Sequence, residues 1–188
     1  MTTPPQSVLR QDGLRARRAL DAGSRAAFSE IITSRFLRSP RFLSAQSVAC
    51  YLSTEDEVDV LPIISRCWAA SKRVYLPVTA PGRRLRFVEV LRKTRLRRSS
   101  FGLFEPQEGD EIDPLEIDTV VVPMVAFDDA GCRIGMGGGY YDTTFRALRR
   151  PRALRTPKLI GVAFECQKVQ KIKANPWDIA VCEVLTEA

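Results

Sequence analysis

The segment DTVVVPMVAFDDAGCRIGMGGGYYD (118–142) joins an apolar run to a glycine-rich loop and the start of a helix. Residues 118–127 form the most apolar stretch of the chain and predict a buried, central β-strand. Four glycines then fall within five residues, at 135 and 137–139, and a helical pattern follows them directly. A strand, a turn and a helix in this order form the repeating unit of α/β proteins.

The rest of the chain alternates between the same two kinds of element. Apolar or period-two runs predict further strands, and apolar residues three or four positions apart predict helices. A second helix, which Asp21 or Ser24 can cap, should bury a stripe made of Phe28, Ile31, Ile32 and Phe36. We expect strands at 47–53, 72–78, 83–90, 158–164 and 178–186, other helices at 7–20, 58–71 and 139–150, and a loop over 99–117.

This alternation predicts an α/β protein with one domain over residues 1–188. Its sheet should be mostly parallel and covered on both faces. In such sheets ligands bind beyond the carboxyl ends of the strands. Because the polar segments 53–57, 127–141 and 164–167 each follow a predicted strand, we expect them to meet at that edge.

The composition excludes several classes of function. The chain has 188 residues, no histidine and five cysteines. Without histidine, His-based triads and metal sites are excluded. An odd number of cysteines without a CxxC pair argues against a disulfide scaffold or a zinc site, and favours small buried thiols in a reducing cytoplasm. No apolar run could span a membrane and no secretory signal is visible, so we expect a cytoplasmic protein.

The charge is unevenly distributed along the chain. The formal net charge is +7, and residues 1–100 hold 19 of the 29 basic side chains but only 8 of the 22 acidic ones. A basic half is most often a solvated surface, but it also suits an anionic small ligand or a nucleic acid. The segment 83–98 is the most basic, yet Phe87 is its one aromatic residue, whereas single-strand binders offer several stacking rings. We therefore expect no nucleic-acid partner.

The glycine-rich loop has the composition of a phosphate-binding loop. Without Cβ atoms its backbone can adopt positive φ and approach a ligand closely, and its N–H groups can cradle phosphate. Arg133 could add positive charge, and Asp142 stands where a carboxylate could reach Mg²⁺. The loop matches neither GxGxxG nor GxxxxGK[ST], so a Rossmann site and a Walker loop are not supported. The alternative is a plain β–α turn that binds nothing.

The run VPMVAFDDAGCRIGMGGGYYD (122–142) closely resembles the signature of 5-formyltetrahydrofolate cyclo-ligases, with Ile134 in place of leucine. Further matches to that family occur in the expected order along nearly the whole chain: YLSTEDEVD (51–59), KRVYLPV (72–78), FGLFEP (101–106), IGVAFECQ (160–167) and NPWDIAVCEVLTE (175–187). The resemblance implies a three-layer α/β/α fold of the NagB/RpiA/CoA-transferase-like kind. It also implies conversion of 5-formyltetrahydrofolate, with or without a polyglutamate tail, to 5,10-methenyltetrahydrofolate, with Mg²⁺ and with ATP hydrolysed to ADP and phosphate.

The resemblance also assigns roles to individual residues. Arg133, Tyr140 and Asp142 would be catalytic, and Asp142 and Asp178 would hold Mg²⁺. The implied ATP-binding residues are Arg10, Arg133, Ile134, Gly135, Met136, Gly137, Gly138, Gly139, Tyr140 and Tyr141. The implied folate-binding residues are Leu52, Glu57, Phe101, Met136, Gly137, Gly138 and Tyr140.

The implied chemistry needs neither a histidine nor a covalent enzyme intermediate. The formyl oxygen attacks the γ-phosphate, N10 then closes the ring, and phosphate departs, so positioning and charge neutralisation suffice. The chain departs from the family where Gln6 and Thr143 replace residues that are often basic, and where some relatives carry lysine at Gly138. We expect a monomer that binds small molecules.

Blander interpretations stand beside these assignments. Glu57 belongs to an acidic cluster just before a helix and could act in capping it. Arg10 could lie on a solvated face, Phe101 could be a packing residue and Asp178 a turn residue. Competing functions are an inactive or re-purposed relative with the same fold, a sugar-phosphate or coenzyme A enzyme, and a nucleic-acid binder that uses 83–98.

Overall fold

The computed structural model describes residues 3–99, 102–149 and 157–188. Its helices are α1 (Gln6–Ala19), α2 (Ala22–Arg38), α3 (Pro40–Ser44), α4 (Leu61–Ala69) and α5 (Tyr140–Thr144), with short 3₁₀ helices η1 (Pro114–Glu116), η2 (Arg146–Arg149) and η3 (Glu165–Gln167). Its strands are β1 (Ser47–Ala49), β2 (Arg73–Ala80), β3 (Arg84–Glu89), β4 (Leu96–Arg98), β5 (Phe104–Pro106), β6 (Glu111–Ile112), β7 (Thr119–Pro123), β8 (Ala126–Phe127), β9 (Arg133–Ile134), β10 (Lys158–Val162) and β11 (Glu183–Leu185).

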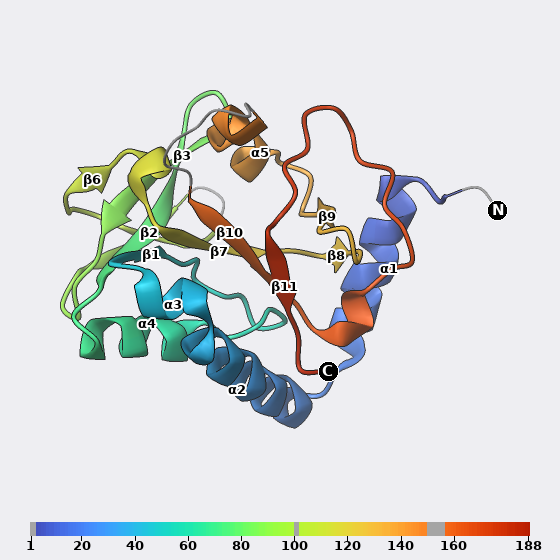
Figure 1. Ribbon diagram of the computed structural model, residues 1–188, viewed down its shortest axis with the longest axis horizontal. Helices are drawn as coiled ribbons and strands as arrows, with labels where there is room; N and C mark the ends of the chain where they lie inside the picture. The colour runs from blue at the N-terminus through green and yellow to red at the C-terminus, as the bar shows by residue number, and fades with distance from the viewer. Residues whose placement is uncertain (1–2, 100–101, 150–156) are drawn as a thin grey trace.

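Seven of the strands form the central sheet (Figure 1), in the order β11-β10-β7-β1-β2-β3-β6. The four pairings from β11 to β2 are parallel, and the two that add β3 and β6 are antiparallel. The apolar strand expected around 118–127 is β7, and it lies inside the sheet with every residue from Thr119 to Val122 buried. The prediction of a mostly parallel sheet with a central apolar strand is confirmed.

The sheet has an apolar cluster on each face, which gives the expected three layers. Helices α2, α3 and α4 cover one face, where Ile32, Phe36 and Ile63 pack against the strands. On the other face Phe145, which directly follows α5, and Leu148 of η2 pack with Tyr75 and Phe87. This second layer is thin, because the helix expected over 139–150 is two short pieces.

Helix α1 lies beside the hairpin of β8 and β9 rather than over the central sheet (Figure 1). Leu9 packs there with Ala126, Ile134 and Ile172 in a third, smaller cluster. Gly13 is buried against Val125, the residue before β8, and a Cβ at this position would come within 3.0 Å of the carbonyl oxygen of Val125. The close contact between the two backbones requires glycine.

Several sequence expectations were wrong in detail. Ile31 is 41% exposed, since α2 turns it away from the sheet, whereas Ile32 and Phe36 are fully buried and Phe28 is half-buried. The range 99–117 is not all loop, because β5 and β6 lie in it. The strand expected over 178–186 is only Glu183–Leu185. All five thiols are free, but Cys166 and Cys182 are exposed rather than buried.

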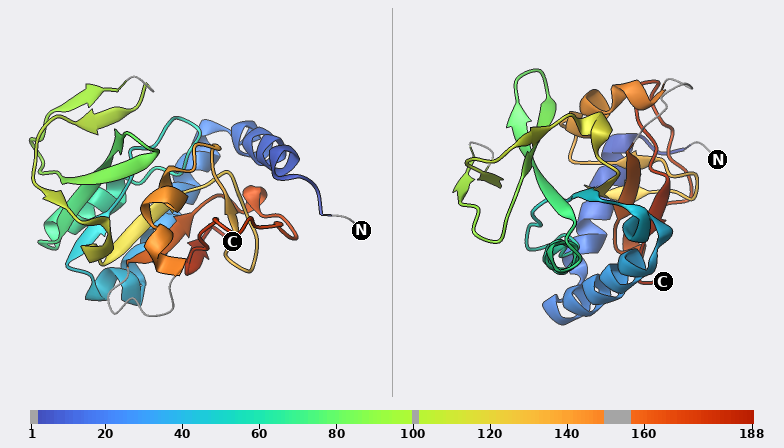
Figure 2. Two further views of the ribbon diagram at one scale, coloured as in Figure 1. Left: turned by 90° about the horizontal axis from the view of Figure 1, so that it is seen from above. Right: turned by 60° about the vertical axis from the view of Figure 1, so that its left-hand side comes forward.

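Strands β4 and β5 form a hairpin separate from the central sheet (Figure 2). It is attached through Glu105, which is 5% exposed and accepts hydrogen bonds from the backbone N–H and the hydroxyl of Thr79. No helix within the described ranges is both long and apolar enough to cross a membrane.

Candidate active site

The glycine-rich loop connects β9 to α5 and exposes its backbone. Gly137 and Gly139 have φ of +98° and +69°, values that a residue with a Cβ rarely adopts. Gly138 has no room for a side chain, because a Cβ would meet the ring of Tyr140 at 2.8 Å. The backbone conformation therefore favours glycine at 137 and 139, and the contact with Tyr140 favours it at 138.

Arg10 reaches this loop from α1. Its Nε donates a hydrogen bond to the carbonyl oxygen of Gly135 at 2.8 Å, and its guanidinium lies against Gly137. Among the described residues its two terminal nitrogens have no hydrogen-bond partner. The arginine is thus fixed by one nitrogen, and a planar fork remains to bind an anion. The hydrogen bond therefore places Arg10 beside the glycine-rich loop, while its side chain stays partly exposed.

Arg133 and Asp142 form an ion pair at the base of the loop. Both terminal nitrogens of Arg133 donate to Oδ1 of Asp142 at 3.0 Å, and one also donates to the carbonyl oxygen of Ile179 at 2.6 Å. The backbone N–H of Ile179 completes the set by donating to the same Oδ1 at 3.0 Å. The Arg133 side chain is 5% exposed and that of Asp142 23%. The pair therefore binds 178–181 to the loop, which explains why this segment does not continue as a strand.

Asp178 precedes Ile179 and is also held through one oxygen. Its Oδ2 accepts hydrogen bonds from the backbone N–H of Asn175 at 2.8 Å and from Nε2 of Gln6 at 3.1 Å. The hydrogen bonds that Asp142 accepts all go to its Oδ1, so each carboxylate keeps one oxygen without a hydrogen bond among the described residues. No cluster of three or more acidic, histidine or cysteine side chains with metal-binding geometry occurs in the described part of the chain.

Glu57 lies in the loop after β1, among groups of both signs. Its Oε2 accepts a hydrogen bond from the backbone N–H of Thr54 at 2.9 Å, and its Oε1 is 3.7 Å from Nη1 of Arg17. Burial raises the pKa of Tyr141 far above its usual value, and the nearby charge of Glu57 raises it further, while Arg133 lowers it. Glu57 therefore lies close enough to the residues around the glycine-rich loop to act on them electrostatically.

The capping interpretation of the acidic cluster applies to a neighbour of Glu57. Helix α4 begins after Val60, and the backbone N–H of Leu61 donates to Oδ1 of Asp59 at 3.0 Å. Glu57 lies three residues before Val60 and accepts no hydrogen bond from the helix within the described residues. The interpretation of Glu57 as a capping residue was wrong.

The other predicted site residues differ in how far their side chains are exposed to solvent. Ile134 is 2% exposed and packs with Leu9, so only its backbone faces the loop. Met136 is 65% exposed, and Leu52 packs at the margin of the larger core cluster. Tyr140 is half-buried beside Gly138. Phe101 lies outside the described residues.

Sequence reasoning missed Arg17, which is 3% exposed although it lies in a helix rich in arginine. Its Nε and Nη2 donate to Oδ2 of Asp56, at 3.3 and 3.0 Å. Burial alone would raise the pKa of Asp56, but the charge and hydrogen bonds of Arg17 outweigh it and lower that pKa. The signal in the sequence was the spacing of seven residues from Arg10, which places both on one face of a helix.

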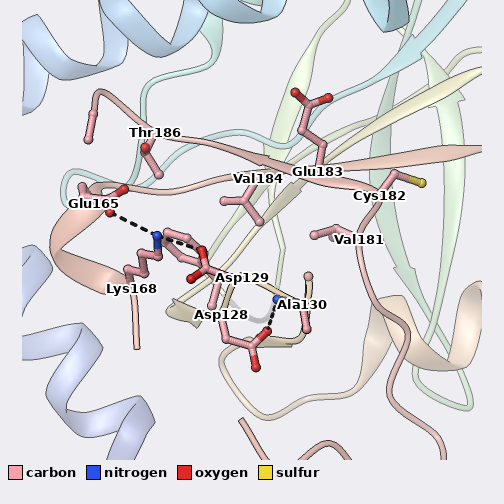
Figure 3. A pocket seen from close by; sticks show the side chains of 13 residues that line it. Asp128, Asp129, Ala130, Glu165, Lys168, Val181, Cys182, Glu183, Val184 and Thr186 are labelled. Atoms are coloured by element: carbon pink, nitrogen blue, oxygen red, sulfur yellow. Dashed lines mark hydrogen bonds and ion pairs between the residues drawn. The ribbon is translucent and has the colours of Figure 1, made fainter. Parts of the chain in front are cut away.

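A separate cavity of about 470 Å³ lies between the β8–β9 turn, η3 and β11 (Figure 3). Lys168 lies in it and pairs with Asp129 at 2.8 Å and with Glu165 at 3.8 Å. Asp128 orders the turn by accepting from the N–H groups of Ala130 and Cys132. None of the glycine-loop residues lines this cavity.

The mostly parallel sheet, the glycine-rich loop with an arginine beside it and the nearby carboxylates Asp142 and Asp178 define an α/β protein with a candidate ligand-binding site. The model of the 5-formyltetrahydrofolate cyclo-ligase family matches residues 2–187. The chain therefore belongs to that family, whose members are ligases.

Individual relatives agree with this membership. The chain is 34% identical over 174 residues to a 5-formyltetrahydrofolate cyclo-ligase of Escherichia coli, covering 90% of this chain and 93% of that one. It is 30% identical to a protein of the same name from Haemophilus influenzae, covering 98% and 99%. A solved 5,10-methenyltetrahydrofolate synthetase of Aquifex aeolicus superposes with a TM-score of 0.82 at 32% identity, covering 97% and 89%.

Proposed function

We propose that the protein catalyses the ATP- and Mg²⁺-dependent cyclisation of 5-formyltetrahydrofolate to 5,10-methenyltetrahydrofolate, releasing ADP and phosphate. The observation that carries the proposal is the glycine-rich loop with Arg10 fixed against it. The relatives named above are cyclo-ligases and synthetases for these two folates.

Phosphate groups would lie along the exposed backbone of residues 135–139. Open N–H groups of a glycine loop suit phosphate oxygens, and the free fork of Arg10 can bind two of them at once. Arg133, at the start of the loop, would contribute positive charge while it remains paired with Asp142. The positive side chains lower the repulsion that phosphoryl transfer must overcome.

The donor set beneath the loop fits Mg²⁺. Asp142 and Asp178 meet through Ile179. Asp178 directly precedes Ile179 in the sequence, and the backbone N–H of Ile179 donates to Oδ1 of Asp142. Each offers an oxygen that no described residue occupies. One or two carboxylates completed by substrate phosphate oxygens form the usual protein site for this ion. When bound, Mg²⁺ would neutralise charge on the phosphates.

Glu57 would bind the pterin end of the folate. Its Oε1 lies 3.7 Å from Arg17, beyond hydrogen-bond distance, so its lone pairs can accept from an N–H donor of a ligand. Leu52 and Met136 would add apolar contact on either side.

The reaction then follows from the placement of the two substrates. The formyl oxygen attacks the γ-phosphorus, a new O–P bond forms, and the bond to the bridging oxygen breaks to release ADP. N10 attacks the activated formyl carbon, the C–O bond breaks, phosphate leaves, and N10 loses its proton. The protein holds the reacting atoms in line and excludes water, which is how much of the rate of such reactions is gained.

An absorbance assay for 5,10-methenyltetrahydrofolate tests the proposal directly. Purified protein, 5-formyltetrahydrofolate and MgATP should give product, while the same mixture without ATP, or with EDTA, should give none. Folded protein that makes no product with MgATP would refute the proposed function.

Substituting Glu57 by glutamine should weaken folate binding selectively. A hydrogen bond to a charged group contributes about 1.5–3 kcal/mol, so the dissociation constant for 5-formyltetrahydrofolate should rise by one to two orders of magnitude. Calorimetric titration measures it, and affinity for ATP should stay unchanged. Glu55→Gln, in the same cluster but exposed, is the matched control and should bind folate normally. Equal weakening of both ligands would contradict the assignment.

The basic side chains before Phe101 should favour substrates with a polyglutamate tail. Arg92, Lys93, Arg95, Arg97 and Arg98 are all exposed on the segment that leads into β4 and along it. Single exposed pairs contribute only ~0–1 kcal/mol, but several together should lower the KM of a triglutamate substrate at low salt. Near ~0.5 M salt the screening length is a few Å, and the difference should shrink.

The triple substitution of Arg95, Arg97 and Arg98 by serine should remove that difference between the substrates and leave ATP binding intact. Arg38 and Arg41 are also exposed, at the end of α2 and in α3, so serine at both provides the control. Equal KM values for mono- and triglutamate at every salt concentration would mean that the segment is only a solvated surface.

A further inference from the structure

Helix α1 contacts both halves of the candidate site with one face. Arg10, Gly13 and Arg17 are spaced by three and four residues, so they line up along the helix. Arg10 bonds to the glycine-rich loop, Gly13 lies against Val125 of the β8 segment, and Arg17 reaches the loop that holds Glu57. The same helix therefore spans from the proposed nucleotide-binding loop to the proposed folate-binding carboxylate.

Arg17 is buried between two carboxylates. Its side chain is 4% exposed, and it makes two hydrogen bonds to Oδ2 of Asp56 while Nη1 lies 3.7 Å from Oε1 of Glu57. Burying a guanidinium costs free energy that only well-placed partners offset. Since Asp56 and Glu57 are adjacent, one planar fork fixes the direction in which both carboxylates point.

The hydrogen bond from Thr54 N–H leaves Glu57 with one constrained oxygen. It holds Oε2, whereas Oε1 faces only the charge of Arg17 among the described residues. Removing that charge would leave two neighbouring half-buried carboxylates to repel each other, and Oε1 would turn toward solvent. The oxygen that would accept from a ligand is thus the one that Arg17 attracts.

We propose that Arg17 is a positioning residue for the folate: it holds Glu57 in the orientation that binds the pterin end, and does so without contacting either substrate. The inference rests on the proposed function, because it assigns the folate to Glu57. A purely structural role for Arg17 would instead be to fasten α1, and its loss would then disturb the nucleotide-binding loop through Arg10 as well.

Equilibrium binding separates these two roles. Calorimetric titrations would use 5-formyltetrahydrofolate and, separately, a non-hydrolysable ATP analogue with Mg²⁺. Arg17→Met should raise the dissociation constant for the folate at least tenfold and change that for the nucleotide less than twofold. Arg17→Lys, which keeps the charge but loses the fork, should fall between it and the unaltered protein. The control is Arg18→Met, because Arg18 is 65% exposed and its one ion pair within the described ranges is with Asp56.

A double-mutant cycle with Glu57→Gln tests whether Arg17 acts through Glu57. The weakening caused by Arg17→Lys should largely disappear when Glu57 is already glutamine. The milder variant serves here because Arg17→Met could fail to fold. Effects that simply add, or that strike folate and nucleotide equally, would overturn the inference while product formation by the unaltered protein still supports the proposed function. If the unaltered protein binds no 5-formyltetrahydrofolate, the proposed function itself fails and the inference fails with it.

Discussion

Asp142→Ala is expected to lower turnover at least tenfold, about 1.4 kcal/mol of activation free energy, and to destabilise the fold at the same time. Arg133, 5% exposed, would lose the carboxylate that accepts from both of its terminal nitrogens. Removing one partner of a buried ion pair costs about 3 kcal/mol or more. In a chain of this size that lowers the melting temperature by about 6–12 °C. Scanning calorimetry and the absorbance assay measure the two effects.

Asp142 has two expected roles, stabilising the fold through Oδ1 and binding Mg²⁺ through Oδ2, and two measurements distinguish them. If it only bound Mg²⁺, its loss would raise the Mg²⁺ concentration needed for activity and leave the melting temperature unchanged. Because Oδ1 is already filled by Arg133 and Ile179, we expect both the melting temperature and the Mg²⁺ requirement to change. Asp129→Ala is the control, since that carboxylate is 81% exposed and pairs with Lys168 at the surface. A variant with unaltered stability and turnover would contradict both roles.

The local chemistry of the loop was readable from sequence because glycine is so specific. Four glycines in five residues mark a backbone that can adopt positive φ and lie close to a ligand, and the ordered matches to a family add the residues that surround them. The apolar run at 118–127 likewise has one stable place, inside a sheet covered on both faces. The parallel core and its central apolar strand were therefore predictable.

Residues whose role depends on a distant partner were less predictable. Arg17 belongs to a run of arginines, and its burial depends on Asp56 and Glu57, which are about forty positions away. The expected strand at 178–186 is interrupted because Ile179 bonds to Asp142 and Val181 to Gly131 instead of to a strand. Apolar periodicity cannot predict such contacts. Residues 178–182 have a composition that suits a strand, but their backbone hydrogen bonds depend on which distant residues lie beside them.

Gly13→Ala is expected to reduce activity by about two orders of magnitude, although alanine is the better helix former. Alanine in place of glycine favours a helix by about 1 kcal/mol. The new Cβ, however, would come within 3.0 Å of the carbonyl oxygen of Val125, a backbone atom that cannot rotate away. Helix α1 must then move outward, and it carries Arg10 away from Gly135. A misplacement of about 1 Å at a reacting group can cost about a hundredfold in rate.

Overpacking of this kind costs about 1–3 kcal/mol, so the clash should outweigh the gain in helix propensity and lower the melting temperature slightly. The control is Gly23→Ala in α2, an exposed position where the nearest atom to a new Cβ is Oδ1 of the Asp21 side chain at 3.1 Å, not a backbone atom. There the propensity term should prevail, with stability unchanged or raised and turnover unaffected. Because Arg10 and Arg17 flank Gly13 on α1, the Gly13 variant should also weaken both folate and nucleotide binding, unlike Arg17→Lys. If Gly13→Ala were as active and as stable as the unaltered protein, α1 would not be the rigid connection between the two loops.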